Sequence, residues 1–363
     1  MPLAKAAVMP SLDQLSAQLD RLASFEPGPF PVLSLYLNMQ PDQHGRDHFE
    51  PFIRKELAER VRTYPASGPE RESLEKDAEK IRQYVADVDS SANGLAIFAC
   101  AGAELFDAVV LAAPIQEHRL YISDQPHLYP LARLIDEYPR YAALLADTRS
   151  ARIFVFAANA VERSQQIEGV KTKRHKMGGW SQARYQRHTE NYHVHHAKEV
   201  VDALARIVRD ESIGSIVISG DEVIVPLLKE QLPKDLAERV IDVVKLEVHA
   251  SEREVLEKTI AALREKDVES DRGRVDELLG AYRANGLAVV GVENTRKALE
   301  MGEVDELIIT ASPEALKMEE RVADELVTKA RQTAAKIRFI EDAALLSATG
   351  GVGAFLRFKV SRQ

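Results

Sequence analysis

The chain has few residues that form covalent cross-links and no long apolar run. Its 363 residues include one cysteine, Cys100, and one tryptophan, Trp180. A single cysteine excludes an internal disulfide and is typical of a reducing compartment, so we expect a cytoplasmic protein. Cys100 lies in the apolar run GLAIFACAG, which indicates a buried thiol rather than a nucleophile. No apolar stretch reaches the ~18–20 residues of a membrane span, and Pro10 and Asp13 interrupt any secretion signal.

Positive charge is outnumbered, because 48 Lys and Arg residues face 57 Asp and Glu residues and the formal net charge is −9. This balance argues against nucleic-acid binding over the whole surface but leaves room for a local basic site. With 45% hydrophobic and 29% charged residues, the composition is that of an ordinary soluble protein. The chain has no internal repeat or low-complexity tract, and its length predicts two or three domains.

Residues 1–138 read as an N-terminal α/β domain of unknown role. The alternating run FPVLSLYLNM predicts a strand, and GLAIFAC and FDAVVLAAPI predict two buried strands. Two polar helices are expected over 45–63 and 68–88, the second with an apolar face that can cover a sheet. Three prolines in QPHLYPLARLIDEYPRY mark the exit from this block.

Residues 139–268 predict a mixed sheet with a helix on each side. YAALLADTRSARIFVFA indicates a hairpin that turns at 147–150, and ERSQQIEGV a third strand. A helix follows over about 190–210, with apolar positions at helical spacing. GSIVISG is then a buried strand, and Asp221 is placed to cap the helix EVIVPLLKEQL.

Residues 269–363 predict an α/β/α sandwich. RVDELLGAYRANG indicates a helix ended by Gly286, and SPEALKMEERVADELVTKARQTA a helix with a serine cap and a proline at its first position. Strands are expected at LAVVGV, DELIITA, KIRFIE and GAFLRFKV, with a helix at NTRKALEMGEV. The glycine-rich TGGVG lacks the Lys-Ser/Thr of a phosphate-binding loop and predicts a tight turn. The charge runs RESLEKDAEK and EKDVESDRGR are interpreted as solvated helix faces or linkers.

The segment KRHKMGGWSQARYQRH, residues 173–188, is basic and contains no Asp or Glu. The glycine pair Gly178-Gly179 permits positive φ and close backbone approach. Trp180 offers a ring for stacking on an unpaired base, worth ~1–3 kcal/mol, and Gln182 an amide that donates and accepts. Six basic side chains can neutralise phosphates: Lys171, Lys173, Arg174, Lys176, Arg184 and Arg187. The segment therefore favours RNA binding, and a plain solvated loop is the alternative.

Two stretches resemble one known family. GGWSQARYQRHTENYHVHHAKEV resembles the tip and following helix of the archaeal/eukaryotic class-I peptide chain release factors, which carry GGQ, a serine, an Arg-aromatic-x-Arg run and Asn-Tyr. GLAVVGVENTRKALEMGEVDELIIT and the ending GGVGAFLRF resemble their C-terminal domain. The resemblance covers about 139–363. It implies an RNase H-like middle domain and a C-terminal α/β/α domain like kink-turn-binding ribosomal proteins.

The sequence departs from that family at two places. The first block lacks the Asn-Ile-Lys-Ser and Tyr-x-Cys-x-x-x-Phe elements that read stop codons, whereas VLSLYLNMQPD resembles the divergent bacterial branch associated with ribosome rescue. Trp180 stands where the family has its glutamine, and Gln182 follows two residues later. Either the loop presents Gln182 along a different path, or hydrolysis has been lost.

The resemblance implies a ribosome-associated protein that hydrolyses peptidyl-tRNA in termination or rescue. Gly178 and Gly179 would permit backbone approach, Gln182 would orient the water, and the basic residues would hold rRNA and the tRNA acceptor end. It also implies a translational GTPase as a partner, and this chemistry requires no cofactor. Two alternatives stay open: a non-catalytic surveillance factor like Pelota, and an RNA-binding protein unconnected to ribosomes.

Other groups of polar residues are weaker candidates for chemistry. His188, His193, His195 and His196 lack an H-E-x-x-H pattern and carboxylate support, so we interpret them as surface imidazoles near phosphate rather than as a metal site. A two-metal nuclease needs several convergent carboxylates. Asp147 reads better as a turn residue, and Asp210, Glu211 and Asp221 show no convergence with it.

Overall fold

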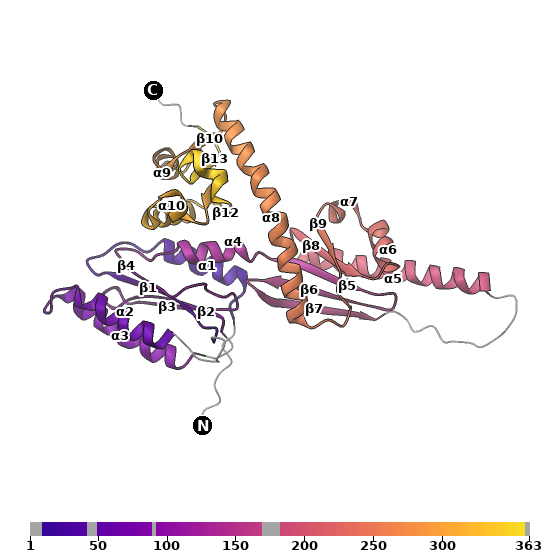
Figure 1. Cartoon of the computed structure of the whole chain (residues 1–363), viewed down its shortest axis with the longest axis horizontal. Coiled ribbons are helices and arrows are strands. Elements are labelled where there is room, and N and C mark those ends of the chain that lie inside the picture. Colours follow the sequence, from indigo (N-terminus) through magenta and orange to yellow (C-terminus); the bar gives the residue numbers. More distant parts are fainter. Residues whose placement is uncertain (1–8, 42–48, 89–91, 169–181, 360–363) are drawn as a thin grey trace. The chain divides into compact units, whose positions relative to one another are not determined.

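The computed structural model describes residues 9–41, 49–88, 92–168 and 182–359, with side chains left undescribed at 182–190. The fold is mixed α/β with three separate sheets (Figure 1). The chain divides into two compact units. Residues 138–269 form the middle unit, and residues 1–137 together with 270–363 form the other. We call the two parts of the second unit the N-lobe and the C-lobe. No helix among the described residues has the length and apolarity to cross a membrane.

The N-lobe is a four-stranded antiparallel sheet with helices on both faces (Figure 1). Its strand order is β3-β2-β1-β4, formed by Val32–Asn38 (β1), Gly94–Cys100 (β2), Leu105–Leu111 (β3) and Arg119–Ser123 (β4). One face is covered by α2 (Phe49–Arg62) and α3 (Pro69–Ala86), the other by α1 (Leu12–Ala23) and α4 (Tyr129–Glu137). The predicted strands and the two predicted helices are confirmed. The elements α1, β4 and α4 were not predicted. Pro130 lies in the first turn of α4, where a backbone N–H has no intrahelical acceptor, so this proline does not interrupt the helix.

A buried carboxyl joins α3 to the short 3-10 helix Ala101–Ala103 that follows β2. Asp77 is 1% exposed, and its Oδ2 accepts a hydrogen bond from Ala101 N at 3.1 Å. Burial raises the pKa of Asp77 to about 6, although the Ala101 bond opposes this shift. Neighbouring Cys100 is fully buried, and burial raises the pKa of its thiol, which confirms the predicted inert cysteine.

The middle unit is a five-stranded sheet of order β7-β6-β5-β8-β9. Its strands are Tyr141–Ala146 (β5), Ser150–Ala157 (β6), Ala160–Glu168 (β7), Ser215–Gly220 (β8) and Val240–Val244 (β9). The first three pair antiparallel, as the predicted hairpin and third strand required, and β5, β8 and β9 run parallel. One face is covered by α5 (Gln182–Asp210) and α6 (Ile224–Gln231). The other meets α8 (Glu252–Arg283), where Tyr141 Oη lies 2.8 Å from Thr259 Oγ1. The strand β9 and the short α7 (Lys234–Ala237) were not predicted.

The C-lobe is the predicted α/β/α sandwich. Its strand order is β10-β13-β11-β12, formed by Ala288–Val290 (β10), Val304–Thr310 (β11), Lys336–Ile340 (β12) and Val352–Leu356 (β13). The second half of α8 packs on one face through Val275 and Leu278, and α9 (Val292–Glu300) and α10 (Glu320–Gln332) lie on the other (Figure 1). TGGVG forms the predicted turn, with positive φ at Gly350 and Gly351.

Two of the predicted C-lobe boundaries are wrong. The helix expected from Ser312 onwards is a 3-10 helix, Pro313–Leu316, followed by α10, because Lys317 takes a left-handed conformation with φ 55°. The helix expected at RVDELLGAYRANG starts earlier, because it is the last part of the 32-residue helix α8. The charge run 265–274 lies in the same helix with residues 265–270 exposed, which confirms its interpretation as a solvated helix face. Its residues favour helix, and ion pairs at helical spacing join Lys266 to Glu269 and Arg274 to Glu277.

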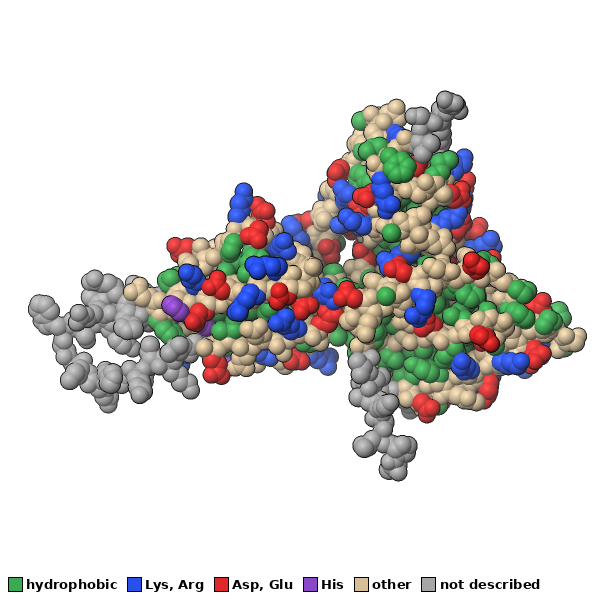
Figure 2. Space-filling model, turned by 180° about the vertical axis from the view of Figure 1, so that it is seen from behind, with side chains coloured by type: hydrophobic (Ala, Val, Ile, Leu, Met, Phe, Trp, Pro, Cys, Tyr) green, Lys and Arg blue, Asp and Glu red, His purple; other side chains and the backbone are tan. Residues whose placement is uncertain are grey.

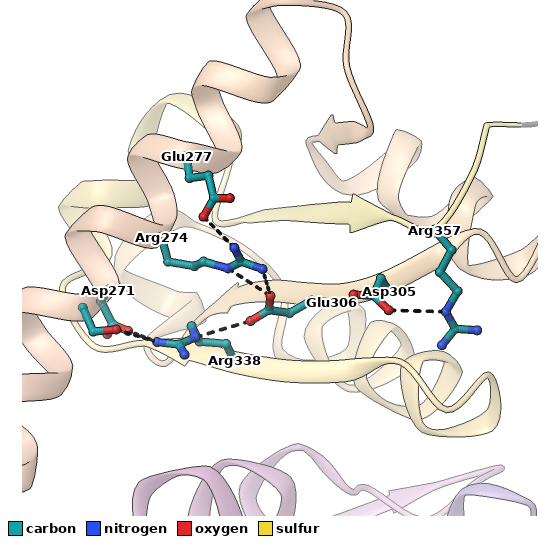
Figure 3. A network of polar contacts seen from close by, with 8 residues as sticks. Asp271, Arg274, Glu277, Asp305, Glu306, Arg338 and Arg357 are labelled. Atoms are coloured by element: carbon teal, nitrogen blue, oxygen red, sulfur yellow. Dashed lines mark hydrogen bonds and ion pairs between the residues drawn. The ribbon is translucent and has the colours of Figure 1, made fainter. Parts of the chain in front are cut away.

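A polar network fastens α8 to the C-lobe sheet (Figure 3). The carboxylate of Glu306, whose side chain is 10% exposed, contacts Arg274 of α8 and Arg338 of β12. Arg338 Nη1 also lies 3.3 Å from Asp271 Oδ1. The Arg274 guanidinium stacks 3.9 Å from the ring centre of Phe355. Two cations therefore share one largely buried carboxylate, which connects α8 to two strands.

We expect Glu306→Ala to lower the free energy of unfolding of the full chain by roughly 2–3 kcal/mol. The change leaves Arg274 and Arg338 without their shared acceptor, while their partial exposure keeps the loss below that of a fully buried pair. Denaturant titration measures the effect. Asp305→Ala is the matched control on the same strand, because its pair with Arg357 is exposed and should contribute about 1 kcal/mol or less. Equal losses in both variants would contradict this account.

The raised pKa of Asp77 predicts a pH-dependent stability. The pKa of Asp77 is higher in the folded chain than in the unfolded chain, so its protonated form stabilises the fold. This contribution to stability is present at low pH and is lost as the pH rises through about 6. Asp77→Asn imitates the protonated form and can still accept from Ala101 N. We expect the free energy of unfolding of the variant to equal that of the unmodified chain near pH 4. At pH 7 we expect it to be higher by about 1–2 kcal/mol. Scanning calorimetry at both pH values tests this, and a variant less stable at pH 7 would refute it.

Candidate functional site

The predicted RNA-contacting segment falls mostly outside the described residues. Lys171, Lys173, Arg174, Lys176, Gly178, Gly179 and Trp180 all lie there. Gln182, Arg184 and Arg187 lie in α5, which begins at Gln182 rather than near 190. The prediction of a loop extending to His188 is therefore wrong over 182–188, where the backbone is helical. A helix can start here because 182–190 contains no Gly or Pro, and polar composition alone does not mark a loop.

Helix α5 joins this segment to the core of the middle unit. Its buried face starts at His196 and Ala197 and continues at the predicted apolar positions, among them Val200, Leu204 and Ile207. From 191 to 195 no residue is buried. The part of α5 from His196 onwards therefore packs into the core, whereas residues 191–195 are exposed or half-buried.

The side chain of His188 lies outside the described residues, and the three described histidines of α5 do not form one site. His195 is exposed, and its Nδ1 lies 3.6 Å from Glu199 Oε1, whereas the ring of His193 meets Tyr192 edge to face at 6.1 Å. His196 is 1% exposed, so its interpretation as a surface imidazole is wrong. Within the described part of the chain, no group of three His, Cys, Asp or Glu residues is arranged to hold a metal ion.

His196 is unusual because neither ring nitrogen has a hydrogen-bond partner although both are buried. A buried polar group without a partner lowers stability, since it loses its hydrogen bonds to water. Its spacing from Val200 and Leu204 places it on the apolar face of α5. That spacing was visible in the sequence and is the signal that predicts burial.

Two of the four acidic side chains considered for nuclease chemistry, Asp147 and Asp221, serve local structure. Asp147 Oδ1 accepts bonds from the backbone N–H groups of Arg149 and Ser150, each at 2.7 Å, which confirms it as a turn residue. Asp221 Oδ1 accepts from the N–H groups of Val223 and Ile224 and so caps α6, as predicted. These carboxylates are occupied at separate turns.

A cleft of about 280 Å³ lies between the N-lobe and the C-lobe. Arg119, Tyr121 and Arg133 line it from the N-lobe, and Ser312 and Glu314 from the C-lobe. Charges of both signs face it, so the cleft does not select one ligand charge. It could not be predicted from the sequence because its two walls come from distant segments.

Acidic and basic side chains alternate over the face of the molecule seen in Figure 2, with no single basic surface. This distribution agrees with the net charge of −9. Any contact of this face with nucleic acid therefore depends on local groups rather than on the overall field.

Comparison with family models gives two matches in chain order. Residues 126–264 match bacterial archaeo-eukaryotic release factor family 10, and residues 269–360 match eRF1 domain 3. The first match includes the middle-unit sheet and α5, and the second includes the C-lobe sheet with the second half of α8.

Curated relatives carry the name peptide chain release factor subunit 1. The protein of Methanopyrus kandleri is 28% identical over 200 residues, which cover 53% of this chain and 48% of that protein, so the chain spans about half of its length. The protein of Pyrococcus abyssi is 24% identical over 331 residues, covering 74% and 80%. Among solved structures, archaeal aRF1 is 19% identical with a TM-score of 0.30, covering 98% of this chain and 100% of that one. Saccharomyces cerevisiae Dom34 is 14% identical with a TM-score of 0.43, covering 71% and 74%.

We expect His196→Leu to raise the free energy of unfolding by about 1–2 kcal/mol. Leucine fills a similar space and removes two buried nitrogens that lack partners. His195→Leu is the matched control, because it makes the same change at an exposed neighbour and should shift stability by less than about 0.5 kcal/mol. Denaturant unfolding of the full chain measures both. A loss of stability in His196→Leu would show that the imidazole contributes a favourable contact.

Proposed function

Because the chain belongs to the archaeo-eukaryotic peptide chain release factor superfamily, we propose that it binds the ribosome and releases the nascent peptide by hydrolysing the peptidyl-tRNA ester through residues 171–188. The family matches confirm the resemblance read from the motifs. The observation that carries the proposal is the basic run 171–188 with its glycine pair, which extends into the start of α5 within the matched region. On this proposal the middle unit is the RNase H-like domain, and its order of three antiparallel and two added parallel strands supports that assignment.

Ester hydrolysis at the ribosomal peptidyl centre places few demands on the factor. A water must be held beside the ester carbonyl, the developing oxyanion or leaving hydroxyl must be stabilised, and bulk water must be excluded. Backbone N–H groups and one amide side chain meet these demands. In the proposal, Gly178 and Gly179 allow the backbone to approach the ester, and Gln182 orients the water.

The start of α5 at Gln182 supports this assignment. The first N–H groups of a helix have no intrahelical acceptor and carry partial positive charge, which suits a developing negative oxygen. Trp180 stacks on an unpaired base of the tRNA end. The six basic residues between Lys171 and Arg187 neutralise phosphates of rRNA and tRNA.

A second candidate function is ribosome surveillance without hydrolysis. The observation that favours it is Trp180 in the place of the family glutamine. Such a factor would bind stalled ribosomes through the same basic segment and leave the ester intact. In either case the C-lobe is the proposed docking domain for a translational GTPase.

We expect Gln182→Ala to slow peptide release from purified ribosome–nascent-chain complexes by about 10²–10³-fold, the usual effect of losing one oriented donor. Ribosome binding, measured by cosedimentation, should be unchanged. Gln186→Ala is the matched control, since it removes an amide one helical turn later in the same segment. Undiminished release by Gln182→Ala would remove Gln182 from the mechanism.

The unmodified protein decides between the two functions in the same assay, run with and without a stop codon in the A site. Release of the peptide supports hydrolysis, and peptide release without a stop codon assigns the protein to ribosome rescue. Binding without release supports surveillance. Absence of cosedimentation would overturn both and leave an RNA-binding protein unconnected to ribosomes.

A further inference from the structure

Helix α10 of the C-lobe caps helix α4 of the N-lobe. The carboxylate oxygen Asp324 Oδ1 accepts hydrogen bonds from Leu128 N at 2.6 Å and from Tyr129 N at 2.9 Å. These two N–H groups lie at the start of α4, where no intrahelical acceptor exists. A carboxylate here also interacts favourably with the positive end of the helix dipole. The N-terminal cap of α4 is therefore supplied by a residue 196 positions away in the chain.

A buried histidine neutralises the carboxylates of this contact. His127, directly before α4, places Nδ1 3.3 Å from Asp324 Oδ2 and Nε2 3.8 Å from Glu320. Its ring stacks on Tyr121 at 3.7 Å, and Tyr121 Oη donates to Glu320 at 2.5 Å. Burial lowers the pKa of His127, but the neighbouring carboxylates of Asp324 and Glu320 outweigh this effect and raise the pKa to about 9. One cation thus faces two acidic residues of α10 at neutral pH.

Further bonds extend the contact between the lobes. Tyr129 Oη donates to the carbonyl oxygen of Thr310 in β11 at 2.5 Å, and Phe339 N of β12 donates to Asp136 Oδ2 at 3.0 Å. Gln332 Nε2 donates to Ala23 O at 2.7 Å, which joins α10 to α1. Each bond uses a backbone group on one side. A contact of this kind has one register, because sliding the lobes would leave buried N–H and C=O groups without partners.

We propose that the N-lobe and the C-lobe move as one rigid body, held by the Asp324 cap on α4. The three domains predicted from the sequence would then behave as two bodies. A partner bound to the C-lobe is held at a constant position relative to the N-lobe, and the cleft between the lobes keeps its shape. This inference is independent of whether the protein hydrolyses peptidyl-tRNA.

Distance measurement between spin labels tests the proposal on the full chain. Labels are attached at Gln83→Cys in α3 and Lys297→Cys in α9, both exposed, in a Cys100→Ser background. We expect a single narrow distance distribution, and at least a twofold broader one for Asp324→Ala. Glu325→Ala is the matched control, because this neighbour on α10 pairs with Arg296 and Lys329 inside the C-lobe and should leave the width unchanged.

Two outcomes would overturn the proposal. A broad or multiple distribution in the chain with Asp324 intact would show that the lobes move independently. A narrow distribution in Asp324→Ala would show that the cap does not hold them. Should Asp324→Ala fail to fold, Tyr129→Phe removes only the bond to Thr310 O and is expected to broaden the distribution by a smaller amount. Circular dichroism of each variant establishes that it is folded.

Discussion

One constraint governs the architecture: each of the three sheets must be covered on both faces by helices. The helix α8 covers one face of two of these sheets. The first part of α8 covers the middle-unit sheet, with Thr259 against Tyr141, and its later part covers the C-lobe sheet through Val275 and Leu278. Residues 264–270 of the same helix are exposed. Neither sheet could lose α8 without exposing apolar side chains to water, so the two cores share one covalent element.

Two clusters of charged side chains join separate elements of the unit formed by the N-lobe and the C-lobe. In the C-lobe, Arg274 and Arg338 enclose the carboxylate of Glu306, and this arrangement fastens α8 to its sheet. Between the lobes, His127 stands before Asp324 and Glu320. Each cluster contains a largely buried charge, Glu306 in one and His127 in the other, that would be costly without partners, and both clusters join elements distant in sequence. Such clusters contribute a definite geometry rather than large net stability.

The sequence predicted much of the secondary structure and less of its boundaries. The β5–β6 hairpin followed from its apolar runs and the turn at Asp147, and the tight turn at Gly350 followed from its glycines. The start of α5 was missed because polar, basic residues were interpreted as a loop, although they are adequate helix formers. His196 was placed on the surface because its residue type outweighed its position on the apolar face of α5.

The sequence by itself determined the mixed α/β character, the buried Cys100, the capping role of Asp221 and the basic segment 171–188. These depend on local propensity, periodicity and composition, which act within a few turns of chain. Only the tertiary structure decided that Asp324 caps α4 and that α8 serves two cores. Both depend on contacts between segments far apart in the chain, and no local pattern records which distant carboxylate will satisfy a helix end.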